Sequence, residues 1–363
     1  MAMAIALELR LRGASVSILS RDRSAAAAYA AAGMLAPQAE KLQGSMAQLC
    51  LRSRDLYPDW TAKLEALSGL ETGYWASGIL NPVFASEVHN HTPALTTAPA
   101  DSEQTPTQWL DRSAVRQQQP GLSPEVIGGW WFPKDAQVDN RRLVAALTEA
   151  LRQVGVVWHE GVTVTEIEVG QGRQVRAIAT DQGRFTAAHY VLAAGAWSRQ
   201  LWDLPVSPRK GQMLSVQVHN LQARDLQAQD SSSIQPLRQV LYGDHIYIVP
   251  RQDGLIVVGA TLENVEFTAG NTPTGLHQLL GEAIRLYPQL QDFPLVETWW
   301  GYRPTTPDEL PILGPSSLEN LTLATGHHRN GILLAPITAQ WVTDWILEQN
   351  ADALLPDFRW DRF

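Results

Sequence analysis

MAMAIALELRLRGASVSIL, residues 1–19, is the stretch that decides the fold class of this chain. Its first twelve residues predict a helix, and Gly13 is the kind of residue that ends one. The run ASVSIL at 14–19 then predicts a short buried strand, because it is rich in β-branched and apolar residues. Helix, glycine and strand in this order are the second and third pieces of a βαβ unit.

The first strand of that unit, and the glycine loop that should join it to the helix, are missing from the sequence. The helix would begin at Met1 without a capping residue, and a sheet lacking one strand would leave its neighbours as open edges. We therefore expect the recorded start codon to lie inside a longer reading frame. The alternative is a truncated, cofactor-free remnant that at most binds small carboxylates. The nucleotides upstream of Met1 would distinguish the two.

Two kinds of segment alternate along the rest of the chain. Helix–strand units with small-residue turns occur at both ends and in the middle, and antiparallel-looking strands lie between them. This predicts an α/β (α+β) fold in which a discontinuous nucleotide-binding domain carries an inserted β-rich substrate domain. Helices are expected at 1–13, 41–69, 105–120, 140–155, 274–290 and 332–349, and strands at 14–19, 73–85, 126–133, 156–160, 162–169, 175–180, 190–195, 296–302 and 321–324. Between 212 and 259 strands are expected to alternate with turns, and polar loops are expected at 92–107 and 221–234.

Composition excludes several classes of protein. The chain has 363 residues, of which 45% are hydrophobic and 18% charged, so it can bury a large core and is not a disordered protein. A net charge of −9 without a basic tract argues against nucleic acid or a membrane as partner. The single Cys50 excludes a disulfide framework or a zinc ribbon and fits a reducing compartment, so a cytoplasmic location is expected.

Three segments could contact a nucleotide. Ser20 and Arg21 follow the first strand at the place, about 20 positions after the glycine loop, where a polar residue meets the ribose. Ala31–Pro37 could lie flat against a planar ring, because its side chains are small. Tyr190–Ser198 runs from a strand through Ala-Ala-Gly into a helix. Each segment has a plain structural explanation that is as good or better. Ser20 and Arg21 could form an ordinary polar turn, Ala31–Pro37 the start of an alanine-rich helix, and Tyr190–Ser198 a simple strand–turn–helix.

Two further segments carry polar groups that could bind a substrate. Arg303 ends an apolar strand and Arg329 lies in the glycine-bounded loop Gly326–Gly331, so together they could clamp a carboxylate or phosphate. His245 and Tyr247 share one face of a strand and could line a cleft. Structural arginines and a solvent-facing strand are the alternatives. No metalloprotease, CxxC, GxSxG or P-loop pattern is present, and no metal site is expected.

Taken together, these segments resemble the D-amino-acid oxidase family of FAD enzymes, and within it the glycine oxidases of thiamine biosynthesis. AAAGMLAPQAE, VLAAGAWS, YIVPR…GLIVVGAT, GYRPTTPDELPILGP and ATGHHRNGILLAP occur in the family's order and spacing over nearly the whole chain. The resemblance implies a glutathione-reductase-like, Rossmann-like FAD-binding domain, its first strand missing, with an inserted antiparallel-sheet substrate domain. The boundaries that we expect are 1–70, 139–207 and 300–350 for the FAD-binding domain and 71–138 and 208–299 for the substrate domain.

The resemblance also implies a reaction. FAD would take a hydride from the α-carbon of glycine, a small amine or a small D-amino acid, giving an imine that hydrolyses to glyoxylate and ammonia, while O2 reoxidises the flavin to give H2O2. The product would supply thiamine thiazole synthesis, and the protein would mainly bind and orient. A dehydrogenase or demethylating oxidase of the same fold, with another electron acceptor, is the alternative. Neither a nucleic acid nor a membrane partner is expected, and a homo-oligomer is left open.

Site residues follow from the same resemblance. Arg303 and Tyr247 would bind the substrate carboxylate, with Arg329 close by and His245 and Tyr242 lining the cleft. Leu262 stands where glycine oxidases often carry Met, which predicts a preference for small substrates. Ser20 replaces the usual ribose-binding acid. The residues expected to contact the cofactor are Ser20, Arg21, Ala32, Gly33, Met34, Val164, Ala194, Gly195, Trp197, Gly326, Arg329, Asn330, Gly331, Ile332 and Leu333.

Overall fold

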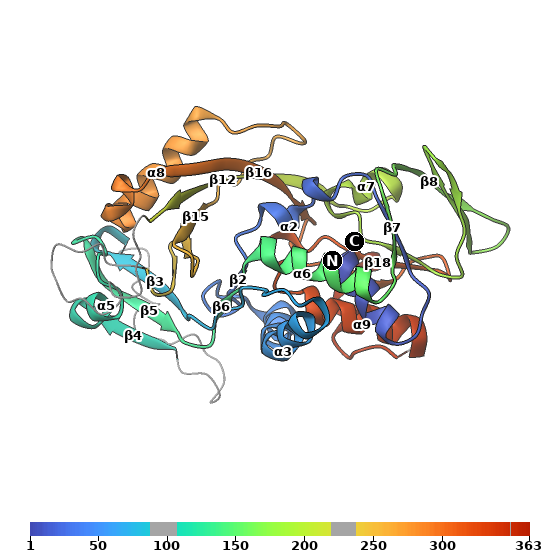
Figure 1. Ribbon diagram of the computed structural model, residues 1–363, viewed down its shortest axis with the longest axis horizontal. Helices are drawn as coiled ribbons and strands as arrows, with labels where there is room; N and C mark the ends of the chain where they lie inside the picture. Colours follow the sequence, from blue (N-terminus) through green and yellow to red (C-terminus); the bar gives the residue numbers. More distant parts are fainter. Residues whose placement is uncertain (88–106, 219–236, 349) are drawn as a thin grey trace.

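A computed structural model of the chain describes residues 1–87, 107–218, 237–348 and 350–363. The molecule is elongated, with α8 and α5 at one end and β8 at the other, and α3, α6 and α9 between them (Figure 1). The polar segment predicted at 221–234 lies outside the described residues, as does all but Thr107 of the loop predicted at 92–107. No helix in these described ranges is both long and apolar enough to cross a membrane.

The opening helix and strand form as predicted. Helix α1 covers Ala2–Leu11, and strand β1 covers Ser17–Ser20. Strand β1 pairs in parallel with β7, Val157–Glu160, from Ser17 opposite Val157 to Ser20 opposite Glu160. A second parallel pair joins β11, Tyr190–Leu192, to β18, Leu321–Thr325, with β17, Ile312–Pro315, antiparallel on its other side. These parallel pairs confirm the α/β part of the predicted fold.

Three helices pack with α1 around one core. They are α3 at Gly44–Ser68, α6 at Asn140–Gln153 and α9 at Ala335–Glu348. In α6, Leu143, Leu147 and Leu151 recur every four residues, so one helix face is apolar and buried. Their neighbours in this core include Leu7 of α1 and Leu49 of α3. Segments from the first, middle and last thirds of the chain therefore share a single core, as a discontinuous domain requires.

An eight-stranded sheet forms the β-rich part, in the order β16-β12-β15-β14-β13-β3-β5-β4. All described neighbour pairs in it are antiparallel except β13 and β3. Helix α8, Pro273–Leu286, packs on this sheet through Leu279, Ala283 and Leu286. The strands are β3 at Ile79–Phe84, β4 at Gln108–Asp111, β5 at Val126–Phe132, β12 at Ser207–Gln217, β13 at Val240–Tyr242, β14 at Tyr247–Pro250, β15 at Leu255–Gly259 and β16 at Leu295–Thr305.

The remaining elements are short. A three-stranded antiparallel sheet of β8, Val164–Val169, β9, Val175–Thr180, and β10, Gly183–Phe185, lies at the end opposite α8 (Figure 1). Strands β2, Met34–Leu35, and β6, Ala136–Gln137, form a two-stranded pair. Helices α2, Ala27–Ala30, and α7, Ser198–Leu201, each span four residues.

The structure differs from the sequence prediction in several places, three of which bear on the fold. Residues 105–120 were predicted as one capped helix, but β4 precedes α5, Arg112–Gln118, because Trp109 packs edge-on against Trp130 of β5. Asp111 caps α5 by accepting from the backbone N–H groups of Ser113 and Ala114. The last helix begins at Ala335, after a 3₁₀ turn at His328–Asn330, and not at Ile332. Strand structure in the predicted 73–85 segment is confined to β3 apart from a bridge at Trp75.

Shortening a core side chain tests the shared core. Leu49 is fully buried, so Leu49→Ala should lower the free energy of unfolding by about 2–5 kcal/mol through lost burial and a cavity. Leu347 of α9 is 44% exposed, so Leu347→Ala should change it by less than about 0.5 kcal/mol. Chemical unfolding followed by circular dichroism measures both. Equal effects of the two substitutions would contradict the assignment of Leu49 to the core.

Candidate functional site

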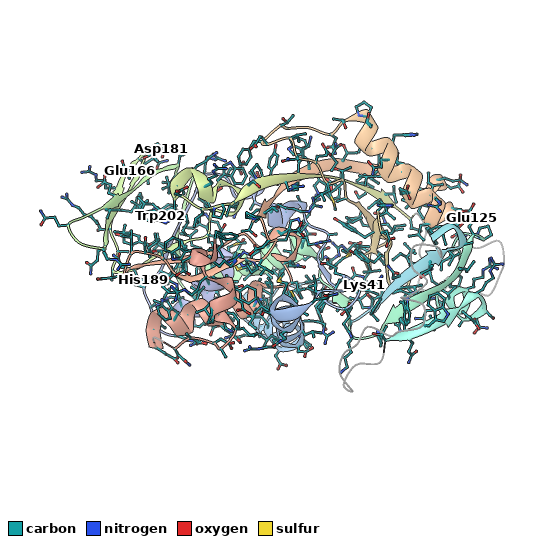
Figure 2. All side chains as sticks on the ribbon, turned by 180° about the vertical axis from the view of Figure 1, so that it is seen from behind. Lys41, Glu125, Glu166, Asp181, His189 and Trp202 are labelled. Carbon is teal, nitrogen blue, oxygen red and sulfur yellow. The ribbon has the colours of Figure 1, made fainter. Side chains whose placement is uncertain are left out.

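A cavity of about 970 Å³ lies where the α/β part meets the eight-stranded sheet. Both parts contribute to its wall: the end of β1 and the alanine-rich segment from one, and β12, β14 and β16 from the other. Lys41, which follows the cavity-lining Glu40, lies between the end that carries Glu125 and the end that carries Glu166 and Asp181 (Figure 2). The cavity is therefore built from residues far apart in the sequence.

The alanine-rich segment 25–33 forms one long side of the cavity and is held from outside. Asn140 Nδ2 donates to the carbonyl of Ala28 at 2.8 Å, Trp299 Nε1 to that of Ala30 at 3.0 Å, and Arg251 Nη2 to that of Ala32 at 2.8 Å. The side chains that face the cavity along this segment are mostly methyl groups. The small side chains on this side leave room for a flat ring to approach the backbone closely.

Gly33 ends this segment in a conformation that requires glycine. Its φ is +78°, and a Cβ there would lie 2.0 Å from the carbonyl oxygen of Val138. That close approach is fixed by a hydrogen bond from the backbone N–H of Val138 to the carbonyl of Gly33 at 2.8 Å. The backbone can therefore turn sharply at the point where β2 begins.

The end of β1 lies at another part of the wall. The carbonyl of Ser20 accepts from the backbone N–H of Val162 at 3.0 Å, which leaves its side chain on the cavity wall. The guanidinium of Arg21 lies over the ring of Trp197, 5.0 Å from its centroid. Two segments that were predicted separately to contact a nucleotide thus meet here.

Arg303 of β16 and Tyr247 of β14 contribute polar groups to the part of the cavity wall formed by the eight-stranded sheet. Arg303 Nη1 donates to the carbonyl of Thr261 at 3.2 Å, and its guanidinium packs so closely on Gly211 that a Cβ there would lie 2.4 Å from Nη1. The hydroxyl of Tyr247 lies 3.3 Å from the Sδ atom of Met213. Burial raises the pKa of Tyr247, although the nearby Arg303 opposes the shift, so the phenol stays protonated and can donate.

Arg329 is already paired with acids. Its Nε atom lies 3.6 Å from Oε2 of Glu40, and its Nη2 atom lies 3.6 Å from Oε2 of Glu309. Arg303, by contrast, has no carboxylate oxygen within 4.0 Å in the part of the chain that the structure describes. Of the two arginines in the predicted clamp, Arg303 is therefore the one available to bind an anion.

Glu40 is a cavity residue to which the sequence analysis assigned no role. Its side chain is 5% exposed, and its Oε2 atom has no hydrogen-bond partner among the described residues. Burial raises the pKa of Glu40 to about 7, although Arg329 and Arg303 oppose the shift. The sequence did contain one signal for Glu40: it is the acid that ends the mostly apolar, small-residue stretch AAAGMLAPQAE.

Asp135 holds the turn that carries Glu40. Its Oδ2 atom accepts from the backbone N–H groups of Gln38 at 3.1 Å and Ala39 at 2.8 Å, while Arg54 Nη1 lies 3.2 Å from Oδ1. Asp135 is fully buried, and burial raises its pKa to about 6. The position of Glu40 therefore depends on a buried ion pair made by two residues distant in sequence.

His328 is neutral and conformationally strained. Its φ is +48°, and burial, reinforced by Arg329, Arg303 and Arg209, lowers its pKa to about 3. The neighbouring His327 is also buried, and its pKa is likewise lowered to about 3. The loop between β18 and α9 therefore brings its positive charge to the cavity through Arg329 alone.

Most of the residues predicted from the sequence line this cavity. Leu262 is also on its wall and is 60% exposed. Gly326, Asn330 and Leu333 do not line it: Gly326 packs on Thr306, and Leu333 lies in the helix core. No cluster of acids, histidines and cysteine able to hold a metal occurs among the residues described. The predicted residues on the wall are Arg303, Tyr247, Arg329, His245, Tyr242, Ser20, Arg21, Ala32, Gly33, Met34, Val164, Ala194, Gly195, Trp197, Gly331 and Ile332.

Comparison with known proteins gives consistent matches. Residues 1–345 match the family described as FAD dependent oxidoreductase. The chain is 52% identical over 340 residues to the bifunctional protein ThiO/ThiG of Trichormus variabilis, covering 93% of this chain and 50% of that protein. It is 30% identical over 326 residues to a glycine oxidase of Bacillus licheniformis, covering 88% of this chain and 82% of that protein. The chain thus spans about half the length of the ThiO/ThiG relative.

A solved structure extends the match to the fold. The glycine oxidase of Geobacillus kaustophilus superposes with a TM-score of 0.90 at 29% identity, covering 99% of this chain and 95% of that one. The arrangement of the α/β part and the antiparallel sheet is therefore that of this oxidase.

The neutral state of His328 gives a test by pH. Unfolded histidine takes up a proton near pH 6.5 and buried His328 does not, so stability is lost as the pH falls below about 6.5. As the pH falls from 8 to 5, this residue should lower the free energy of unfolding by about 2 kcal/mol. His328→Asn, which tolerates the positive φ, should remove that part of the loss in urea unfolding. His277→Asn, at an exposed position, should leave it in place; identical losses in both variants would contradict the argument.

Proposed function

The chain belongs to the family of FAD-dependent oxidoreductases, and from that premise we propose that it is a glycine oxidase. Its substrates are glycine and other small amines or D-amino acids, which it oxidises to imines that hydrolyse, glycine giving glyoxylate and ammonia. O2 is the electron acceptor and H2O2 the second product. The observation that carries this proposal is the placement of Arg303 and Tyr247 on the wall of a cavity whose long side is lined by alanines.

The residues present fit FAD. The cavity runs past the end of β1, the methyl groups of segment 25–32 and the backbone turn at Gly33, so it can take an extended ligand with a flat ring. The first turn of α1 also lines it, and the backbone N–H groups of a helix N-terminus favour phosphate. Ser20 and Arg21 would lie at the ribose, and Ala32, Gly33 and Met34 at the ring. We therefore assign these segments to the cofactor.

The protein's own part in the reaction is to bind and orient the substrate. Arg303 would hold the substrate carboxylate through charge-assisted hydrogen bonds, and the protonated phenol of Tyr247 would donate a further one. FAD, when bound, supplies the hydride acceptor. Fixing the carboxylate at one point would direct the α-carbon toward the side of the cavity that we assign to the flavin ring. Arg329, His245 and Tyr242 would complete the wall.

The proposal also covers the use of the imine product, the cellular compartment and the electron acceptor. We infer that the imine supplies thiamine thiazole synthesis, which agrees with the ThiO/ThiG name of the relative at 52% identity. The cytoplasm is the proposed compartment, because the one cysteine, Cys50, is buried and unpaired. Flavin reduction by glycine without H2O2 in air would instead select a dehydrogenase.

Removing the carboxylate anchor tests the proposal. Arg303→Met should lower kcat/KM for glycine by at least about 100-fold, because the substrate carboxylate loses its charged partner. Arg152→Met, at a residue that is 69% exposed, should keep the wild-type rate. Anaerobic bleaching of the flavin by glycine and H2O2 release in air are the measurements, with flavin content checked in each variant. Bleaching of Arg303→Met at ordinary glycine concentrations would reject the proposed substrate binding.

Substrate size gives a second test. Leu262 lines the cavity at the place where glycine oxidases often carry Met, and this substitution conserves volume. We expect kcat/KM for glycine, sarcosine and D-alanine to exceed that for D-phenylalanine by at least about tenfold, since the bulky ring would meet this wall. A peroxidase-coupled assay with the four substrates measures it. Comparable values for glycine and D-phenylalanine would refute the assignment of a small-substrate site.

A further inference from the structure

Glu40 places a carboxylate inside the cavity at a point that the mechanism above does not use. It lies on the turn between β2 and α3, its side chain is 5% exposed, and its Oε2 atom has no hydrogen-bond partner among the described residues. Leaving a buried polar atom without a partner costs about 1–3 kcal/mol. The ion pair of Oε2 with Arg329 Nε at 3.6 Å offsets part of that cost but supplies no hydrogen bond, so this oxygen can still accept one from a ligand in the cavity.

The surrounding contacts fix this carboxylate in place. Asp135 holds the backbone of Gln38 and Ala39, and Arg54 Nη1 also donates to Oε1 of Gln38 at 3.1 Å. The backbone N–H of Glu40 donates to the carbonyl of Ala36 at 3.0 Å. The turn is tied at four points, so Glu40 keeps its place on the cavity wall.

The charges around Glu40 form two poles. Arg329 lies 3.6 Å from Glu40 and has a second carboxylate, Glu309, at 3.6 Å, so its charge is balanced on both sides. Arg303 has no such partner within the described residues and forms a positive pole. Glu40, whose Oε2 atom is ion-paired with Arg329 but accepts no hydrogen bond among the described residues, forms a negative pole in the same cavity. A cavity with these two poles complements a zwitterion, which carries a carboxylate and an ammonium group.

We propose that Glu40 accepts a hydrogen bond from the substrate's ammonium group and so selects amino acids over hydroxy acids. This inference rests on the proposed function, because it assumes that Arg303 holds the carboxylate of the same ligand. A hydroxy acid of equal size presents a hydroxyl in place of the ammonium, and it gains less from a carboxylate. Glu40 would therefore act on specificity by touching the substrate directly.

The proposal carries a pH dependence. Below about pH 7 Glu40 is protonated, and above it the carboxylate is ionised. Glycine should therefore bind more tightly as the pH rises through 7, and the dependence should vanish when Glu40 is neutral at every pH. The titratable and charged groups that face Glu40 are Arg329, Arg303, Asp135, Glu309, Cys50, Tyr242 and Tyr247.

The test compares two ligands in the FAD-loaded enzyme. The Kd of glycine comes from the concentration dependence of anaerobic flavin reduction, and that of glycolate from the change in flavin absorbance. Glu40→Gln should weaken glycine at least tenfold at pH 8 and change glycolate by less than twofold, and the pH dependence of glycine binding near 7 should disappear. Glu309→Gln removes a carboxylate charge from the other acid that pairs with Arg329, and at pH 8 it should leave the glycine-to-glycolate ratio within twofold of wild type.

Each of the other outcomes has a defined consequence for the assignment. Equal weakening of both ligands would make Glu40 a structural counter-ion of Arg329. If Glu40→Gln loses its flavin, Glu40→Asp keeps the charge and should retain a glycine preference; loss of flavin there as well would assign the acid to the cofactor or the fold. If glycine fails to reduce wild-type enzyme, the proposed function fails, but glycine binding read as an absorbance change still decides the role of Glu40.

Discussion

Arg251 makes the contact on which the geometry of this molecule depends. It follows β14 in the eight-stranded sheet, yet its guanidinium donates to the carbonyls of Ala32 and Val138 and to the side chains of Gln137 and Asn140 at 2.8 to 3.2 Å. Because it is buried, these bonds form in a medium of low dielectric, where losing one would leave an unpaired polar group. One side chain thus joins the sheet to the segment that lines the cavity.

The sequence predicted those parts of the fold and the site that depend on local pattern. The opening helix and strand, the long helix α3 and the placement of Arg303 and Tyr247 in one cavity follow from periodicity and from motifs in register with a family. The sequence did not identify Glu40, because its burial and its neighbours, rather than its local sequence, distinguish it from other acids. The group that holds its turn, Asp135, lies 97 positions from Gln38, and no local pattern records such a pairing.

The predicted clamp of two arginines is the instructive case. Both lie on the cavity wall as predicted, but Glu40 and Glu309 balance the charge of Arg329, and sequence spacing could not reveal either partner. Several ionisable groups of the cavity are therefore either paired with an opposite charge or neutral. Burial keeps His328 neutral and the Tyr242 phenol protonated, with pKa values near 3 and 12. Of the two arginines in the predicted clamp, Arg303, which has no carboxylate partner among the described residues, is the one left to bind an anion.

The two longest strands constrain how a ligand enters and leaves. Strands β12 and β16 pair from Ser207 opposite Thr305 to Val216 opposite Leu295, a continuous ribbon that runs along the molecule beside both of its parts (Figure 1). A hinge rotation of one part against the other would break ladder hydrogen bonds along this ribbon. The side chain of Arg329 on the cavity wall is 44% exposed, so small molecules can reach the cavity there without a change in this ribbon.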